Sequence, residues 1–257
     1  MKLIHKTLRM SMLLLAGVLL VSCGWPVTEA ETEKPEPGYP SIGVGRPVHD
    51  VPAEDTGITI CIDPGHGFDD VGCSSTYLTD GKEEKDMTLQ YAKALQEALE
   101  QMGYTVLLTH DGNTFPEEFN TYKNNIFSAS ERAAYVNSLD VDYFMSLHCD
   151  TYDDDDSIGG IRVYYYDSSV KTDTYSGAVA NSISAYLAKE FPDAKAPAVH
   201  DNQSYAVLRE TTAAAALVEI GFISNRTDAE NIQNPAWQEK FIDGLAAGIN
   251  GYFTLYQ

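Results

Sequence analysis

The sequence predicts a single α/β domain in which about five or six helices flank a six-stranded, mostly parallel and twisted sheet. Two observations support this prediction. Short apolar runs alternate along the chain with longer segments of helical periodicity, which is typical of βαβ units whose helices cover both faces of a parallel sheet. The region 57–257 is also long enough to bury a substantial core, and it contains no internal repeat that would indicate a second module.

The first half of this region has the predicted order strand, helix, strand, helix, strand. Gly103 ends the first helix, because glycine readily adopts the left-handed conformation found after helices. Either Ser128 or Ser130 can cap the second helix. The predicted strands span 58–63, 104–109 and 141–147, and the predicted helices span 85–102 and 128 or 130 to 139.

The second half adds three strands and three helices to this order. Residues 160–166 place Ile161, Val163 and Tyr165 at every second position, which is the period of a strand. Further strands are predicted at 205–208 and 214–220 from their apolar runs. Helical spacing predicts helices at 174–190, 227–232 and 235–252.

The first 22 residues have the layout of a secretory signal peptide, with three basic residues before an apolar stretch at 10–21 that is too short to span a membrane. The tetrapeptide Leu20-Val-Ser-Cys23 resembles a bacterial lipobox, in which the signal is cut before the cysteine and the cysteine is lipidated. We therefore expect a lipid anchor on Cys23; an ordinary signal with an incidental cysteine is the alternative. Residues 23–56 are rich in Pro, Glu, Thr and Gly and are predicted to form a disordered tether.

The net charge argues against a nucleic-acid-binding protein. With 17 basic and 38 acidic residues the formal charge is −21, and loss of the three basic residues of the signal takes it from −21 to −24. Such a surface repels phosphate backbones and offers anionic lipids no basic patch. Membrane attachment would therefore depend on the lipid. We also expect the chain to be a monomer.

Four cysteines leave the redox state open. If Cys23 is lipidated, three remain, and they cannot all pair within one chain. Cys61 falls inside the first strand and is predicted to be a buried apolar side chain. Because Cys73 and Cys149 both lie near candidate site residues, a disulfide between them and two free thiols both fit the sequence. Alternation along the strand points Cys149 away from His148, which disfavours it as a metal ligand.

Two histidines and a glutamate, His66, His148 and Glu219, close three of the apolar runs. In open α/β sheets the loops beyond the carboxyl ends of the strands meet in one crevice, so these side chains are expected to converge. Imidazoles and a carboxylate there indicate a metal site, and a catalytic zinc typically has three protein ligands and one open position. Glycines on both sides of His66 permit a tight turn. Asp63 is a candidate acceptor for the second nitrogen of a ligand histidine.

A further carboxylate is expected where the first helix begins, because this helix follows the first strand on the same side as His66. Glu83 and Glu84 both lie there, and spacing alone does not choose between them. An acidic helix start that interacts only with the helix dipole is the alternative.

Six short motifs lie in collinear order along the folded region. They are Asp63-Pro-Gly-His66-Gly, Glu84-Lys-Asp86, Ser130-Glu-Arg132, Ser146-Leu-His148, Val207-Leu-Arg209 and Leu217-Val-Glu219-Ile-Gly-Phe-Ile-Ser-Asn225. Together they resemble the zinc-dependent N-acetylmuramoyl-L-alanine amidases of type 3. The resemblance extends from about residue 58 to residue 252 and covers essentially the whole folded region.

The resemblance implies a zinc enzyme that hydrolyses the amide bond between N-acetylmuramic acid and L-alanine in peptidoglycan. The implied zinc ligands are His66, Glu84 and His148, and the implied catalytic carboxylate is Glu219. The glutamate of the family lies two positions before the helix aspartate, which selects Glu84 over Glu83. In the implied mechanism zinc lowers the pKa of bound water to roughly 7, and Glu219 carries a proton from that water to the leaving amine. The enzyme would be exported and anchored by its lipid at the outer face of the cell membrane, facing the wall.

Three positions depart from the pattern of the family. The chain has Thr109-His110-Asp111 where Thr-Arg-Asp is common, Cys149 where a small or polar residue is usual, and His200-Asp201-Asn202 in place of an arginine-glycine pair. We expect His110 to be a surface histidine rather than a ligand or a substrate contact. Arg209 is a candidate contact for a peptide carboxylate, because guanidinium groups bind carboxylates in two places; a structural salt bridge is the alternative.

Two other functions compete with this prediction. A catalytically idle, wall-binding lipoprotein could keep the fold, although it would have no need for all four site residues. A zinc peptidase that cuts within the stem peptide would use the same metal chemistry on a different bond.

Overall fold

The structure is a computed structural model and describes residues 54–166, 175–192 and 197–256. The predicted signal peptide (1–22), the predicted lipidation site Cys23 and the predicted tether up to residue 53 lie outside the described residues. Among the helices that are described, none is both long and apolar enough to cross a membrane.

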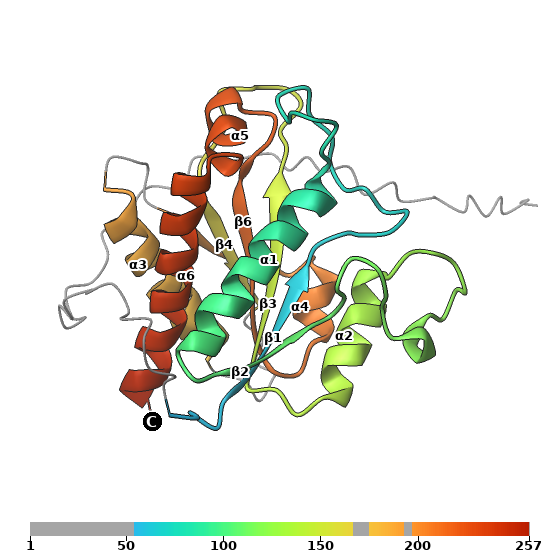
Figure 1. The fold of residues 1–257 in the computed structure, drawn as a ribbon, viewed down its shortest axis with the longest axis vertical. Helices are drawn as coiled ribbons and strands as arrows, with labels where there is room; N and C mark the ends of the chain where they lie inside the picture. The colour runs from blue at the N-terminus through green and yellow to red at the C-terminus, as the bar shows by residue number, and fades with distance from the viewer. Residues whose placement is uncertain (1–53, 167–174, 193–196, 257) are drawn as a thin grey trace, which may run out of the picture.

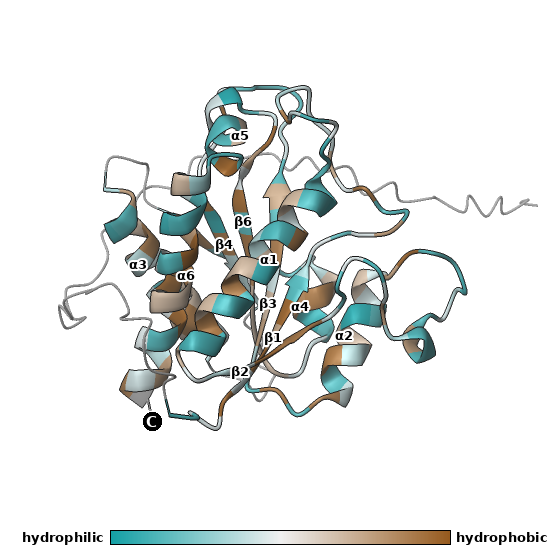
Figure 2. Ribbon diagram, in the orientation of Figure 1, coloured by the Kyte–Doolittle hydropathy of each residue, from teal (hydrophilic) through white to brown (hydrophobic). Residues whose placement is uncertain are grey.

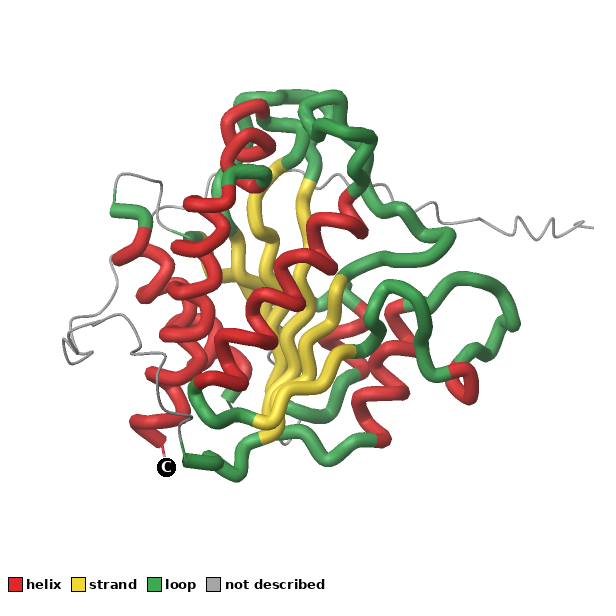
Figure 3. Tube along the Cα trace, viewed as in Figure 1, coloured by secondary structure: helices red, strands yellow, loops and turns green. Residues whose placement is uncertain are grey.

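In the described part of the chain, six strands form one sheet in the order β2-β1-β3-β6-β4-β5 (Figures 1 and 3). Strands β1, β2, β3 and β6 run parallel, whereas β4 pairs antiparallel with β6 and parallel with β5. This confirms the predicted six-stranded, mostly parallel sheet. The strands are β1 (Thr59–Pro64), β2 (Thr105–Leu108), β3 (Tyr143–Asp150), β4 (Arg162–Tyr165), β5 (Ala198–Asp201) and β6 (Ala214–Phe222).

Six α-helices of the described ranges surround this sheet, with a short 3-10 turn at Glu117–Phe119. Three of them, α1 (Glu84–Gln101), α3 (Ser176–Glu190) and α6 (Pro235–Tyr256), pack on one face. Two others, α2 (Ala129–Ser138) and α4 (Ala206–Glu210), pack on the opposite face, and α5 (Arg226–Ile232) follows β6 (Figure 1). Helices therefore cover both faces, as the alternating periodicities predict.

Each face of the sheet has its own apolar core. The larger core lies under α1, α3 and α6, and the smaller one lies under α2 and α4. Between them, β6 is mostly hydrophobic in Figure 2. Alternation along β3 sends Met145 and Leu147 into the larger core and Phe144 into the smaller one. His148, four residues after Phe144, therefore faces the side of the sheet that carries α2 and α4.

Side-chain caps fix the starts of the two helices that flank the site. Glu83 is the N-cap of α1, and its amide donates to the Asp86 carboxylate at 2.9 Å. Ser128 caps α2, since its hydroxyl accepts from the amide of Glu131 at 3.4 Å while the Glu131 carboxylate accepts from the Ser128 amide at 3.0 Å. Of the two predicted caps of α2, Ser128 is the one used.

The prediction of a strand at 205–208 is wrong, because these residues begin α4. The Asn202 side chain accepts from the amides of Ser204 and Tyr205 at 2.7 and 3.0 Å, and this turn starts a helix within an apolar run that reads as a strand. The sixth strand is instead β5, which pairs with β4 at the edge of the sheet. Its four residues are too few to show a period.

Candidate metal centre

Three side chains from separate elements converge beyond the carboxyl end of β1. His66 lies in the loop after β1, Glu84 is the first residue of α1, and His148 lies in β3. Their ligand atoms all lie within 4.8 Å of one another. Glu84 Oε1 is 3.2 Å from both His66 Nε2 and His148 Nδ1. The structure thus brings together the three residues that the sequence predicts as zinc ligands.

Backbone amides hold the Glu84 carboxylate at this point. Oε2 accepts from the amide of Cys73 at 2.6 Å, and Oε1 accepts from the amide of Cys149 at 2.9 Å. A Cβ at Gly72 would lie 2.5 Å from Glu84 Oε2, so only glycine fits beside the carboxylate. Burial opposes the ionisation of Glu84, yet the hydrogen bonds to His148 and His66 hold the pKa of its carboxyl well below its usual range.

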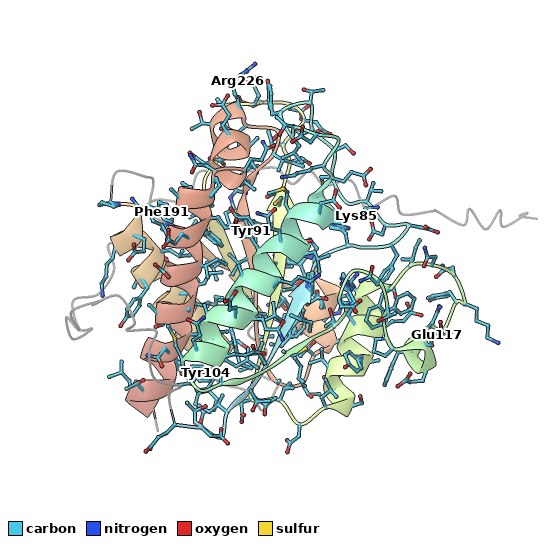
Figure 4. The ribbon with its side chains drawn as sticks, viewed as in Figure 1. Lys85, Tyr91, Tyr104, Glu117, Phe191 and Arg226 are labelled. Atoms are coloured by element: carbon cyan, nitrogen blue, oxygen red, sulfur yellow. The ribbon has the colours of Figure 1, made fainter. Side chains whose placement is uncertain are left out.

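Lys85 connects the start of α1 to the His66 loop. Its ammonium donates to the carbonyl of Phe68 at 2.9 Å and pairs with Glu83 at 3.1 Å. Figure 4 shows Lys85 at the end of α1 that approaches these loops. Glu83 is therefore occupied as cap and as ion-pair partner, while the next side chain, Glu84, turns inward.

The orientation of His66 depends on Asp70, and the prediction that Asp63 orients a ligand histidine is wrong. His66 Nδ1 lies 2.9 Å from Asp70 Oδ2, which leaves Nε2 directed at Glu84. Burial lowers the pKa of His66, but the hydrogen bonds to Asp70 and Glu84 outweigh it and raise the pKa to about 10. His66 also has a positive φ of 64°, a conformation that the loop must hold in place.

Asp63 instead forms a buried ion pair with Arg132, and this pair supports the same loop. Its Oδ1 lies 2.7 Å from Arg132 Nη1, and it accepts from the hydroxyls of Thr109 and Ser146 at 2.5 and 2.7 Å. The guanidinium of Arg132 also donates to the carbonyls of Pro64, at 2.7 Å, and His66. The ion pair thus connects β1 and α2 to the backbone of the His66 loop.

The His148 ring packs against a glycine. A Cβ at Gly65 would lie 2.4 Å from His148 Cε1, so any side chain there would displace the imidazole. The Gly65 carbonyl accepts from the Thr88 hydroxyl of α1 at 2.7 Å, which fixes the loop against the helix. The two imidazoles meet edge-on, with ring centroids 4.8 Å apart.

The expectation that His110 lies on the surface is wrong, because it is buried beside the His66 loop. Its Nε2 donates to the carbonyl of Pro64 at 2.8 Å, and its Nδ1 accepts from the amide of Gly112 at 3.3 Å. Burial and the nearby charge of Arg132 lower its pKa, which favours the neutral imidazole that one donated and one accepted hydrogen bond require. His110 therefore stabilises the backbone of the His66 loop.

Glu219 lies beside the three converging residues, on the next strand. In the parallel pairing of β3 with β6, Glu219 is the register partner of His148, and it is buried. Neighbouring strands lie about 5 Å apart, so the two side chains rise from adjacent positions on the same face. Both residues lie inside their strands rather than beyond them, a few positions before the carboxyl ends.

The three cysteines of the described residues are buried, and none of them forms a disulfide. Cys61 is buried, as predicted, and belongs to the smaller core, whereas Cys73 and Cys149 belong to the larger one. Of the two alternatives that the sequence leaves open for Cys73 and Cys149, the structure has two thiols rather than a disulfide. The backbone amides of Cys73 and Cys149, not their sulfur atoms, contact Glu84.

Arg209 lies at the exposed C-terminal end of α4. Its guanidinium is 2.7 Å from the carboxylate of Glu210 and donates to the Ser204 carbonyl at 2.9 Å. The carbonyl of Glu210 accepts from Asn137 near the end of α2, before β6 begins. The predicted contact of Arg209 with a peptide carboxylate stays a prediction.

The donor set fits a divalent cation such as zinc. Two imidazoles and one carboxylate are a common ligand set of catalytic zinc sites. The buried carboxyl of Glu84 keeps its negative charge, and the hydrogen bonds to Asp70 and Glu84 raise the pKa of His66. The site therefore favours the binding of a cation. Asp70 provides the hydrogen bond to the outer nitrogen that ligand histidines usually make.

Comparison with known proteins identifies the family. The model of the N-acetylmuramoyl-L-alanine amidase family matches residues 60–251. The chain belongs to this amidase family. The matched region includes the whole sheet except Thr59, the first residue of β1, together with His66, Glu84, His148 and Glu219.

Solved amidase structures share the fold. An N-acetylmuramoyl-L-alanine amidase from Clostridium difficile 630 superposes with a TM-score of 0.65 at 26% identity, covering 79% of this chain and 98% of that one. The amidase AmiC2 of Nostoc punctiforme gives a TM-score of 0.64 at 26% identity, covering 78% and 99%. The probable cell wall amidase LytH of Staphylococcus aureus is 31% identical over 198 residues, which are 77% of this chain and 59% of LytH. The matched part of the chain thus spans about three fifths of that relative.

We predict that Asp63→Asn lowers the free energy of unfolding by about 3–5 kcal/mol, because it leaves the guanidinium of Arg132 buried without its counter-charge. Urea denaturation followed by circular dichroism measures this change. Arg226→Gln is the control, since Arg226 pairs with Glu230 on the surface at 4.0 Å and its loss should change stability little. A loss below about 1 kcal/mol for Asp63→Asn would contradict a structural role for the ion pair.

Proposed function

We propose that this chain is a zinc-dependent hydrolase that cleaves the amide bond between N-acetylmuramic acid and L-alanine in peptidoglycan. The observation that carries the proposal is the convergence of His66, Glu84 and His148 next to the buried carboxylate of Glu219. Family membership supports the same substrate and bond. In this proposal the first three residues hold the zinc ion and Glu219 is the acid–base.

Held by His66, Glu84 and His148, zinc would polarise the scissile carbonyl and lower the pKa of a water molecule toward neutral. Glu219 accepts a proton from the water that attacks the carbonyl carbon. As the carbon–nitrogen bond breaks, Glu219 returns the proton to the departing amine of L-alanine. One water is consumed, and the products are a lactyl carboxylate on the sugar and a stem peptide with a free amino terminus.

The positions of the residues suit this proton transfer. Glu219 is adjacent to His148 across the β3–β6 pair, so one side chain rises next to the metal ligands without joining them. Asp70, Arg132 and the amides of Cys73 and Cys149 hold the ligands themselves in place. Such preorganised groups lower the cost of orienting the reactants.

We also propose that the enzyme acts outside the cell as a monomer, anchored by a lipid on Cys23 at the outer face of the membrane and carried on the tether 23–56. The lipobox-like sequence at Leu20 to Cys23 supports the anchor. The name of LytH, a probable cell wall amidase, supports an extracytoplasmic site of action.

We predict that the full-length protein, purified in detergent and loaded with zinc, releases whole stem peptides from peptidoglycan. Mass spectrometry should find peptides that begin with L-alanine, together with glycan strands that keep intact N-acetylmuramic acid. Shortened peptides still attached to the sugar would indicate the zinc peptidase instead. Zinc binding without any product would indicate the idle wall-binding protein.

We predict that Glu219→Ala retains zinc but loses amidase activity by about 10²–10⁴-fold, because it removes the proton carrier and no ligand. His148→Ala should lose both zinc and activity. Zinc content by mass spectrometry and release of amino termini from peptidoglycan measure the two properties. Glu230→Ala, an exposed glutamate of α5, is the control and should change neither. Undiminished turnover in Glu219→Ala would refute the acid–base role.

A further inference from the structure

Arg162 extends the row of site residues across the sheet. It is the first residue of β4, and in the antiparallel pairing with β6 it is the register partner of Glu219. His148, Glu219 and Arg162 therefore lie side by side on β3, β6 and β4 and face the same side of the sheet. With strands about 5 Å apart, Arg162 rises about 10 Å from His148, on the far side of Glu219.

A bulge at the end of β6 gives the guanidinium of Arg162 its support. The pairing of β3 with β6 shifts between His148 and Asp150, so that Asp150 faces Phe222 after the irregularity. Phe222 thereby comes under Arg162, whose Cζ lies 4.4 Å from the ring centroid. A guanidinium stacked on an aromatic ring keeps its N–H groups directed outward around its edge.

The polar contacts of Arg162 leave donors for a ligand. Its positive charge opposes the effect of burial, which raises the pKa of Tyr164 two residues along β4. Its Nη1 lies 3.8 Å from Asp150 Oδ2, which is an ion-pair distance but too long for a hydrogen bond. A guanidinium carries five N–H donors. The side chain is 17% exposed, so a ligand can reach it from the open side of the sheet.

The direction of the substrate determines what Arg162 meets. Glu219 returns its proton to the amine of L-alanine, so the peptide side of the scissile bond lies toward Glu219 and the sugar side lies toward the metal. A peptide that continues past Glu219 then runs toward β4. An extended residue advances about 3.3 Å, so the residue after L-alanine comes within reach of the long Arg162 side chain.

We propose that Arg162 binds a free carboxylate on the stem-peptide residue that follows L-alanine and makes the enzyme selective for stem peptides that carry this group. The proposal rests on the proposed amidase function and deepens it. The stacked guanidinium presents a preoriented fork that matches a carboxylate in two places. It is also a cation at the site of a protein whose acidic residues outnumber its basic ones by 38 to 17, so it provides a local anchor for an anionic peptide.

The test compares two soluble muramoyl tripeptides that differ only in whether the second residue has a free α-carboxylate or its amide. For the full-length zinc enzyme we expect kcat/KM to be at least about tenfold higher on the carboxylate substrate, as suits a charge-assisted bidentate contact. Arg162→Gln should abolish this preference through KM, leaving zinc content and kcat/KM on the amide substrate within about twofold. Arg162→Lys should restore part of the preference, because it keeps the charge without the fork.

Two further variants complete the test. Arg226→Gln is the matched control and should keep the preference; Figure 4 shows Arg226 at the outer end of the molecule, where its side chain is 69% exposed. Arg209→Gln tests the other arginine that the sequence singles out. The inference is overturned if the wild type has no preference, if Arg162→Gln lowers both rates equally, or if Arg209→Gln removes the preference. If the wild type cleaves neither tripeptide and also releases no stem peptides from peptidoglycan, the proposed function is overturned instead.

Discussion

A buried carboxylate at the start of α1 is the constraint on which the rest of the site depends. Removing a carboxylate from water costs several kcal/mol unless hydrogen bonds and opposite charge offset the loss. Glu84 obtains the hydrogen bonds from the amides of Cys73 and Cys149, and it faces the imidazoles of His66 and His148. Because these groups belong to the loop after β1 and to β3, one carboxylate holds three segments of the chain in register.

Strand pairing places further functional groups in a row beside these metal ligands. Parallel pairing places Glu219 beside His148, and antiparallel pairing places Arg162 beside Glu219. The metal ligands, the proposed acid–base and the proposed carboxylate contact thus occupy successive strands at intervals of about 5 Å. The buried pair of Asp63 and Arg132 supports the metal end of this line through the backbone of the His66 loop, while Phe222 supports the other end.

Regular periodicity made most of the fold predictable, and the exceptions have local causes. The order of strands and helices follows from apolar spacing, whereas the apolar residues 205–208 became a helix because Asn202 starts a turn before them. In the site, spacing could not separate Glu83 from Glu84, because that choice depends on the cap and on the direction in which each side chain turns. The roles of Asp70 and Arg162 were missed for a related reason. An acidic residue four positions from a histidine is common in sequences, so Asp70 does not stand out. Arg162 can be recognised as a site residue only from its pairing with Glu219.

X-ray absorption spectroscopy of the zinc-loaded full-length protein tests the central claim most directly, because it distinguishes oxygen and nitrogen ligands from sulfur. With Glu84 as the third ligand, the spectrum should contain only nitrogen and oxygen neighbours at about 2.0–2.2 Å from zinc. A sulfur neighbour at about 2.3 Å would mean that a buried thiol, Cys73 or Cys149, binds the metal in place of the Glu84 carboxylate. That result would contradict the account given for the start of α1.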